Sequence, residues 1–252
     1  MPLVRGCTDS YLICGTPRTG STLLCALLES TGVAGHPESY FRQPDEQSLA
    51  VKWGIARPPD GVFDYADYVR AAVAAGRTEN GVFAARIMWG TMDELIEKLE
   101  TVYPDVDGVG PDLLSRAFGH TRFVYLRREN TLAQAVSWLR AEQTNVWHDN
   151  GQSKHEPEQE PRYNFEQICE FVQLIDEHSA AWRQWFASGG IRPHLVRYED
   201  LDADPVGVTR EILDFLCLGL PSKREIHARN RQLADELSAQ WIDRYRAEME
   251  DG

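Results

Sequence analysis

Hydroxyl residues and glycines gather between a short apolar run and an amphipathic segment near the start of the chain. The run YLICG at residues 11–15 is followed by TPRTGST and then by leucines at helical spacing. A strand, a tight loop and a helix in this order form an anion cradle, because the loop amides and the positive end of the helix dipole converge on one point. We therefore predict an anion site formed by consecutive loop residues, namely Arg18, Thr19, Gly20, Ser21 and Thr22.

The position of the loop cation separates this loop from the nucleoside-triphosphatase pattern. Gly15 and Gly20 have the expected spacing, but the pattern requires a lysine directly after the second glycine. Ser21 stands there instead, and the cation of this loop is Arg18. The difference favours an anion other than the terminal phosphate of a magnesium nucleotide. Arg18 would then neutralise negative charge that develops on a bridging oxygen during group transfer.

A second basic group follows the apolar run at residues 121–126. Arg127 and Arg128 come directly after this run, and Ser137 lies on the helix predicted next. Taken alone, these residues would be interpreted as solvent-facing. Together with the loop they favour a ligand site, because basic residues at the carboxyl end of a parallel strand face the crevice where such sheets bind ligands. We predict that Arg128, with Arg127 and Ser137, binds a second phosphate. Two anion sites at one sheet edge fit a nucleotide with phosphates at both its 5′ and 3′ positions.

The elements that must position these residues alternate between strand-like and helix-like patterns. This alternation predicts an α/β fold with a P-loop-like parallel sheet flanked by helices, in a single domain over residues 1–252. Strands are predicted at 11–15, 82–88, 121–126 and 191–198, and helices at 20–30, 92–100 with Thr91 as N-cap, 131–146, 165–186 and 204–216. Residues 148–162 are charged and contain two prolines, which predicts a mobile surface loop. Residues 221–252 read as a polar C-terminal tail that closes with a helical WIDRYR segment.

Composition limits the partners and the location of the protein. The net charge of −13 argues against general affinity for nucleic acid or anionic membranes. The five cysteines are odd in number and form no CxxC pair, so we expect buried free thiols in a reducing compartment. We see neither a secretory signal nor a membrane-spanning run in the sequence, and expect a cytoplasmic protein.

Several motifs together resemble a known family. The loop, the spacing from Arg128 to Ser137 and the segment RYEDLDADP are similar to sulfotransferases that use PAPS (3′-phosphoadenosine 5′-phosphosulfate). More closely, TGVAGHPESYF, DEQS, ARIMW, QAVSWLRA and WIDRYR resemble, in the same order, the bacterial trehalose 2-sulfotransferase family known from mycobacteria. The resemblance implies a P-loop-like fold, a PAPS donor, a carbohydrate or glycolipid hydroxyl as acceptor with trehalose as a candidate, no metal and a homodimer.

The same resemblance places the acceptor site at residues 35–41, GHPESYF. In the family this segment supplies a glutamate that accepts the proton of the attacking sugar hydroxyl. An ungapped alignment sets that glutamate opposite Ser39, which cannot act as a base unaided, so Glu38 is our candidate base and His36 the alternative. Pro17 also replaces a family glutamine thought to touch the sugar. The candidate acceptor-binding residues are His36, Glu38, Ser39, Tyr40, Phe41, Arg86 and Trp89.

Two rival functions and two further groups complete the predictions. A small-molecule kinase would need the missing loop lysine and a metal-binding aspartate, for which only RYED offers a weak substitute. A non-catalytic sulfonucleotide-binding protein would explain the displaced glutamate.

We expect Tyr198, Glu199 and Asp200 to brace the donor site. Arg231 and Gln232 are candidates to close over the nucleotide, or else part of a solvated helix.

Overall fold

Four parallel strands form the sheet that carries the predicted anion loop. The computed structural model describes residues 8–56, 63–108, 110–147, 160–227 and 236–251. The strands β1 (Ser10–Gly15), β2 (Phe83–Met88), β3 (Thr121–Arg127) and β4 (His194–Arg197) lie in the order β2-β1-β3-β4. Gly15 pairs with Met88 and Cys14 with Tyr125, so the carboxyl ends of β1, β2 and β3 meet at one edge. The predicted α/β fold with a parallel sheet is confirmed.

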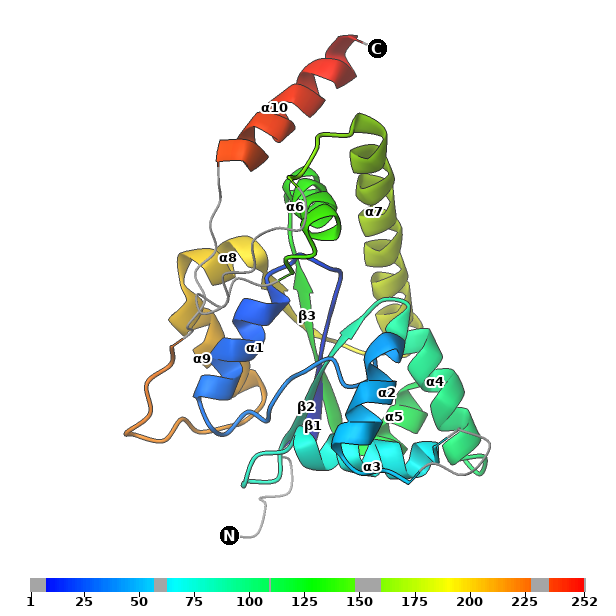
Figure 1. The fold of residues 1–252 in the computed structure, drawn as a ribbon. Helices are drawn as coiled ribbons and strands as arrows, with labels where there is room; N and C mark the ends of the chain where they lie inside the picture. Colours follow the sequence, from blue (N-terminus) through cyan, green and yellow to red (C-terminus); the bar gives the residue numbers. More distant parts are fainter. Residues whose placement is uncertain (1–7, 57–62, 109, 148–159, 228–235, 252) are drawn as a thin grey trace.

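Helices cover both faces of this sheet (Figure 1). On one face lie α1 (Ser21–Ser30), α8 (Tyr198–Ala203) and α9 (Pro205–Phe215). On the other lie α2 (Gln43–Lys52), α3 (Tyr65–Ala75), α4 (Thr91–Val102), α5 (Gly110–Phe118) and α7 (Phe165–Ser188). Near the carboxyl edge of the sheet, α6 (Thr131–Thr144) packs against α7 and against α10 (Glu236–Asp251).

The central strand β1 is fully buried, and its side chains alternate between two cores. Leu12 and Cys14 belong to the aromatic-rich core beneath α2–α5 and α7. Tyr11 and Ile13 belong to the aliphatic core beneath α1 and α9. A third apolar cluster, which includes Trp241, joins α6, α7 and α10. The run YLICG is therefore apolar throughout because both faces of its strand are covered.

Most predicted elements agree with the structure, and two predictions at their boundaries were wrong. The last strand is shorter than residues 191–198, since Pro193 lacks an amide hydrogen for the ladder and Tyr198 already begins α8. Thr91 is the first residue of α4, and Gly90 occupies the N-cap position. The helical WIDRYR segment lies within α10, as predicted. Of the predicted mobile loop, residues 148–159 lie outside the described residues.

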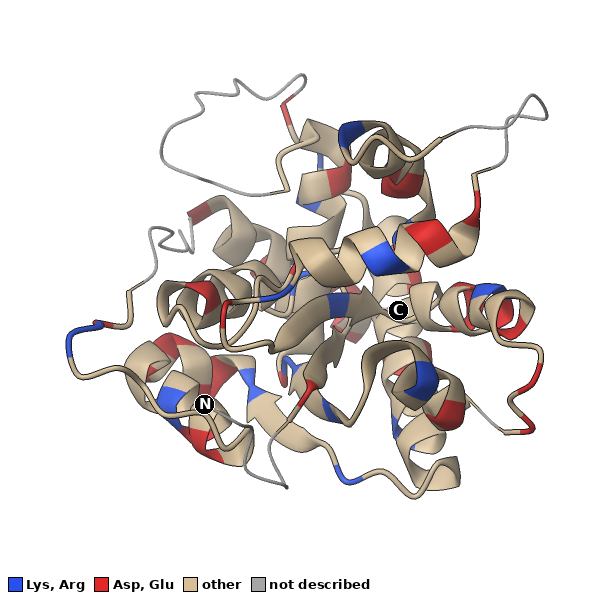
Figure 2. Ribbon diagram, turned by 90° about the horizontal axis from the view of Figure 1, so that it is seen from below, with Lys and Arg blue, Asp and Glu red and all other residues tan. Residues whose placement is uncertain are grey.

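The cysteines and the charges complete the comparison with the sequence. Cys14 and Cys25 are buried free thiols, whereas Cys217 is exposed and Cys169 partly exposed, so the prediction of buried thiols holds only in part. Cys7 lies outside the described residues. Basic and acidic residues are interspersed along the elements in Figure 2. Among the described helices, none is long and apolar enough to cross a membrane.

Candidate donor and acceptor sites

Side chains from distant helices fix the loop between β1 and α1. The indole Nε1 of Trp182, on α7, donates to the carbonyl of Gly15 at 2.9 Å. The amide of Gln134, on α6, donates to Thr16 Oγ1 at 2.7 Å and to the carbonyl of Pro17 at 2.6 Å. Because Gln134 and Trp182 are buried, these hydrogen bonds are shielded from water. The loop is therefore held in shape before any ligand arrives.

The backbone of the loop requires unusual conformations at two positions. Arg18 has a φ of 67°, in the left-handed region that few residues other than glycine adopt. Gly20 has a φ of 82°, and a Cβ atom there would lie 2.6 Å from the ring of Tyr198. Glycine is thus needed at position 20 for both its conformation and its size. α1 begins at the next residue, so its N-terminal amides and positive dipole end face the loop.

Arg18, Arg128 and Ser137 form one cluster beside this helix terminus. Arg18 Nε donates to Ser137 Oγ at 3.0 Å, and its Nη1 donates to the carbonyl of Trp147. Arg128 Nη1 donates to the carbonyl of Arg18 at 3.5 Å, a long hydrogen bond. Its guanidinium lies 4.6 Å from the centre of the Tyr198 ring. The sequence predicted that Ser137 would join Arg128 at a site apart from Arg18, whereas in the structure Ser137 contacts Arg18.

The positive charge of this cluster is partly buried and poorly compensated. Burial lowers the pKa of the Arg18 guanidinium, and the charges of Arg128 and Arg140 lower it further. Burial also lowers the pKa of Arg128, against the opposing effect of Tyr198 and Glu199. Within the described residues, neither Arg18 nor Arg128 has a carboxylate within ion-pair distance, and Arg128 Nε is buried without a hydrogen-bond partner. Such a site fits an anionic ligand that would supply the missing negative charge.

Arg127 does not join the cluster, in contrast to the prediction. Side chains alternate along β3, and Phe123 and Tyr125 face the aromatic-rich core on the side of α7. Arg127 continues that series and forms an ion pair with Glu129. Arg128, the next residue, faces Tyr198 instead.

Two of the three residues expected to brace the donor site contact the arginine cluster or the turn beside it, namely Tyr198 and Glu199, whereas Asp200 pairs with Arg197. The ring of Tyr198 packs against Gly20 and supports Arg128. Glu199 accepts hydrogen bonds from the backbone amides of Glu129 at 3.0 Å and Asn130 at 3.3 Å. These contacts fix the turn between β3 and α6, from which Arg128 projects.

The acceptor segment runs beside the edge strand β2, but its aromatic residues point into the core. The amide of Arg86 donates to the carbonyl of Glu38 at 2.9 Å, and the side chain of Glu38 is exposed. Tyr40 and Phe41 are only 6% and 1% exposed. Both support the segment from within the core, so we no longer assign either as a sugar contact.

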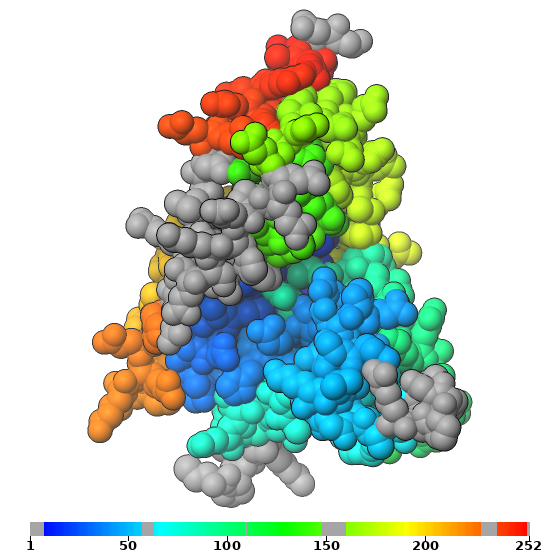
Figure 3. All heavy atoms as spheres, in the orientation of Figure 1, coloured from blue at the N-terminus to red at the C-terminus, as the bar shows by residue number. Residues whose placement is uncertain are grey.

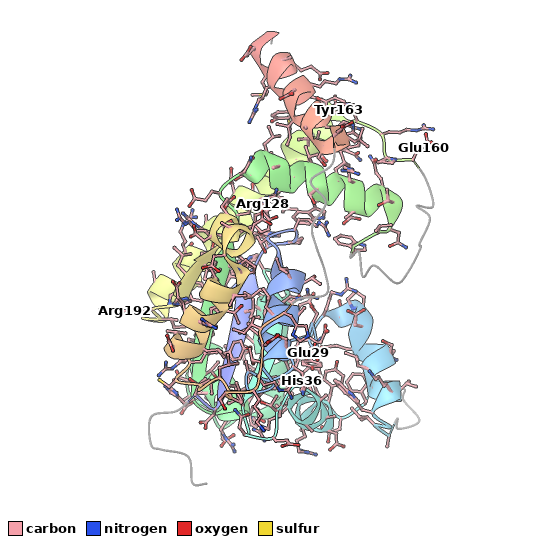
Figure 4. The ribbon with its side chains drawn as sticks, turned by 90° about the vertical axis from the view of Figure 1, so that its left-hand side faces the viewer. Glu29, His36, Arg128, Glu160, Tyr163 and Arg192 are labelled. Carbon is pink, nitrogen blue, oxygen red and sulfur yellow. The ribbon has the colours of Figure 1, made fainter. Side chains whose placement is uncertain are left out.

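His36 lies away from the arginine cluster. Its Nδ1 is 3.1 Å from Glu29 Oε1, and Glu29 is in the last turn of α1, whereas the loop precedes the first turn. Along a helix this separation from Ser21 amounts to about 12 Å. Figure 4 shows Glu29 and His36 side by side and Arg128 well apart from them. This separation counts against His36 as the candidate base.

Comparison with known proteins identifies the family. A family model described as Stf0 sulphotransferase matches residues 10–248. The chain belongs to the Stf0 sulphotransferase family. The match covers all four strands and nearly all of α10, and so includes both candidate sites.

Relatives with assigned functions cover the same length of chain. The trehalose 2-sulfotransferases of Mycobacterium tuberculosis and Mycolicibacterium smegmatis are 29% and 28% identical, each over 94% of this chain and 94% of the relative. A solved sulfotransferase from Alicyclobacillus acidocaldarius is 15% identical with a TM-score of 0.49, covering 98% of this chain and 97% of that one. The sulfotransferase domain of the curacin biosynthetic pathway is 16% identical with a TM-score of 0.43, covering 95% and 96%.

Membership of the Stf0 family decides between the functions that the sequence left open. An Stf0 sulphotransferase is an enzyme that moves a sulfuryl group from a sulfonucleotide donor, so the kinase and the non-catalytic binding protein are wrong. The part of the chain that the structure describes contains no group of three or more His, Cys, Asp or Glu side chains that could hold a metal ion.

Sequence reasoning missed the residues that shape the donor loop. Gln134, Trp147 and Trp182 contact the loop but lie far from it in the chain. For Gln134 a signal existed, because it stands three residues before Ser137 and thus on the same helix face, among apolar neighbours. Arg231 and Gln232, the candidates to cover the nucleotide, lie outside the described residues.

Proposed function

We propose that the protein transfers a sulfuryl group from PAPS to a hydroxyl of a carbohydrate or glycolipid, with trehalose as the first acceptor to test. The observation that carries this proposal is the cluster of Arg18, Arg128 and Ser137 at the N-terminus of α1, which has partly buried positive charge and no carboxylate partner among the described residues. The trehalose 2-sulfotransferases that align over 94% of the chain support the choice of acceptor.

The donor would be held by two parts of the cluster. The N-terminal amides of α1, the hydroxyls of Ser21 and Thr22 and the guanidinium of Arg18 would bind the 5′-phosphosulfate. Arg128, together with Ser137, would bind the 3′-phosphate. PAPS supplies an activated sulfuryl group when bound, and Arg18 would stabilise the charge that develops on the bridging oxygen as that group leaves.

Glu38 is the proposed general base. A bond forms between the acceptor oxygen and sulfur while the bond from sulfur to the bridging phosphate oxygen breaks, and the hydroxyl proton passes to the carboxylate. The products are a sulfate ester and adenosine 3′,5′-bisphosphate. The Glu38 side chain is exposed and belongs to no ion pair among the described residues, so its carboxylate is free to accept a proton. Arg86 and the partly buried Trp89 remain candidates on the acceptor side.

The acceptor would approach the face shown in Figure 3. Dark blue atoms of the segment around α1 reach the surface there, between the green atoms of α6 and the lighter blue atoms of α2. From the family resemblance we also infer a homodimer, in which each subunit is one sulfotransferase domain. From the unpaired cysteines we infer that it is cytoplasmic. Light scattering of the purified protein tests the dimer.

Mass spectrometry of reactions with PAPS and a panel of sugars and glycolipids tests the activity. We expect sulfated product from trehalose or a related glycan, together with adenosine 3′,5′-bisphosphate. Calorimetry should show tight binding of that bisphosphate, equally with and without magnesium, and weak binding of ATP. Tight, magnesium-dependent ATP binding without bisphosphate binding would refute the proposal.

The role of Glu38 has a matched control on α1. Loss of a general base costs about 100- to 10,000-fold in rate, so Glu38→Gln should lose turnover on that scale. Glu29→Gln changes a nearby carboxylate that pairs with His36 and should leave turnover unchanged. Equal losses in the two variants would exclude Glu38 as the base.

A further inference from the structure

One guanidinium connects the donor helix to the acceptor segment. Arg86 Nε donates to Ser39 Oγ at 2.9 Å. Its Nη1 donates to Thr22 Oγ1 at 3.0 Å and to Ser21 Oγ at 3.5 Å. Ser21 and Thr22 form the first turn of α1, and Ser39 stands where the family glutamate would align. A single side chain thus contacts both halves of the candidate site.

The fold of β2 explains why Arg86 points in this direction. Phe83, Ala85 and Ile87 face the aromatic-rich core, and Ala84 faces the aliphatic core beneath α1. Arg86 shares the side of Ala84, since side chains alternate along a strand. It pairs in register with Ile13, two residues before the end of β1, and from there extends to the start of α1.

We propose that Arg86 is a positioning residue that holds the acceptor segment at a fixed spacing from the donor loop. This inference rests on the proposed function, because it takes the start of α1 as the donor site and residues 36–41 as the acceptor segment. Arg86 also binds the segment through its main chain, where its amide donates to the carbonyl of Glu38. The spacing matters because transfer requires the attacking oxygen, the sulfur and the leaving oxygen in line.

Arginine suits this role better than lysine. A guanidinium presents donors in a rigid planar fork, so Nε and Nη1 can contact partners on two separate segments at once. A lysine ammonium carries the same charge on a single nitrogen at the end of a flexible chain. Arg86→Lys therefore keeps the charge and removes the bridge, which separates positioning from simple electrostatics.

Hydrogen–deuterium exchange with and without adenosine 3′,5′-bisphosphate tests the bridge without requiring turnover. In the unmodified protein the bisphosphate should slow amide exchange in the loop around Arg18 and also in residues 36–41. In Arg86→Lys and in Ser39→Ala, protection should remain in the loop and be lost from the acceptor segment. The inference would be overturned if the bisphosphate slowed exchange only in the loop of the unmodified protein. It would also be overturned if both variants kept the slowed exchange in the acceptor segment. No protection of the loop at all would refute the donor site itself.

Kinetics give a second, independent readout. A small misplacement of reacting groups can cost about 100-fold, so we expect Arg86→Lys to lower kcat on that scale with the KM for PAPS little changed. Ser39→Ala should lower kcat in the same way, and the double variant should be no worse than either single one. Additive losses would show that Arg86 does not act through Ser39. Arg70→Lys, an exposed arginine on α3 paired with Asp67, serves as the matched control.

Discussion

Replacing Arg18 by methionine should separate the needs of catalysis from those of stability. The guanidinium is partly buried near Arg128, and these surroundings lower its pKa, so its charged form is less favourable in the folded than in the unfolded protein. At neutral pH arginine is charged in both states, so this cost is fully present. Methionine has a similar length and no charge. The φ of 67° strains both side chains alike, so backbone strain largely cancels in the comparison.

The magnitudes can be worked from the contacts of Arg18. Methionine removes hydrogen bonds to Ser137 and to the Trp147 carbonyl, each worth about 1.5 kcal/mol because the donor is charged, while the relief of a partly buried charge offsets part of that loss. The free energy of unfolding should therefore fall by less than about 3 kcal/mol. The loss of charge stabilisation in the transition state should reach about 2.7–4 kcal/mol, or roughly 100- to 1000-fold in kcat.

Urea denaturation with and without adenosine 3′,5′-bisphosphate measures stability and ligand binding, and a turnover assay on the same variants measures kcat. At a ligand concentration 100 times its Kd, the unmodified protein should gain about 2.7 kcal/mol of stability, and a variant that binds tenfold more weakly only about 1.4 kcal/mol. Arg70→Met changes an exposed arginine on α3 and serves as the control. It should leave turnover, and the stability that the bisphosphate adds, equal to those of the unmodified protein. If Arg18→Met keeps near-normal turnover and gains as much stability from the bisphosphate as the unmodified protein does, the proposed role of Arg18 is refuted.

Three other perturbations test the loop and its supports. Gly20→Ala should lower the free energy of unfolding, measured with urea, by at least about 1–2 kcal/mol, because alanine must adopt a φ of 82° against the ring of Tyr198. An unchanged free energy of unfolding would show that the ring moves aside freely. Gln134→Leu removes the donor to Thr16 Oγ1 and to the Pro17 carbonyl. We expect the free energy of unfolding to fall by about 1–3 kcal/mol, and calorimetry to show weaker bisphosphate binding. Full affinity would mean that the loop does not need this support. Chelation of metals by EDTA should leave the Kd for the bisphosphate unchanged, since the proposed anion-binding groups are arginines, amides and hydroxyls; a large rise in Kd would contradict that view.

The sequence predicted the elements whose signals are local. β1 and β3 each contain four consecutive apolar residues, at 11–14 and 123–126, and the glycines and hydroxyls after β1 mark the loop without any knowledge of the rest of the fold. α2 was not predicted, because QPDEQSLAVK is mostly polar and Pro44 resembles a helix breaker, although proline is well tolerated in the first turn. For the same reason its buried Glu46, paired with Lys98 at 2.6 Å, gave no signal of a core position.

The arrangement within the site could be predicted only in part. Arg18, Arg128 and Ser137 were each identified from their places after strands and on a helix, but the pairing of Arg18 with Ser137 joins residues 119 positions apart. The direction of Arg127 followed from strand alternation and could have been inferred from Phe123 and Tyr125. The distance of His36 from the loop could not, because it depends on how residues 32–39 turn back along β2.

The carboxylate of Glu199 has a consequence for how a nucleotide can sit. The arginine cluster lies between the N-termini of α1 and α6, and both would attract phosphate. At α6, however, Glu199 already accepts from the amides of Glu129 and Asn130, and the Asn130 side chain accepts from Ala133. An incoming anion is repelled there by a resident negative charge and finds donors at α1. A donor phosphate bound at α1 would thus be oriented by exclusion as well as by attraction, because the Glu199 side chain already occupies the amides before α6.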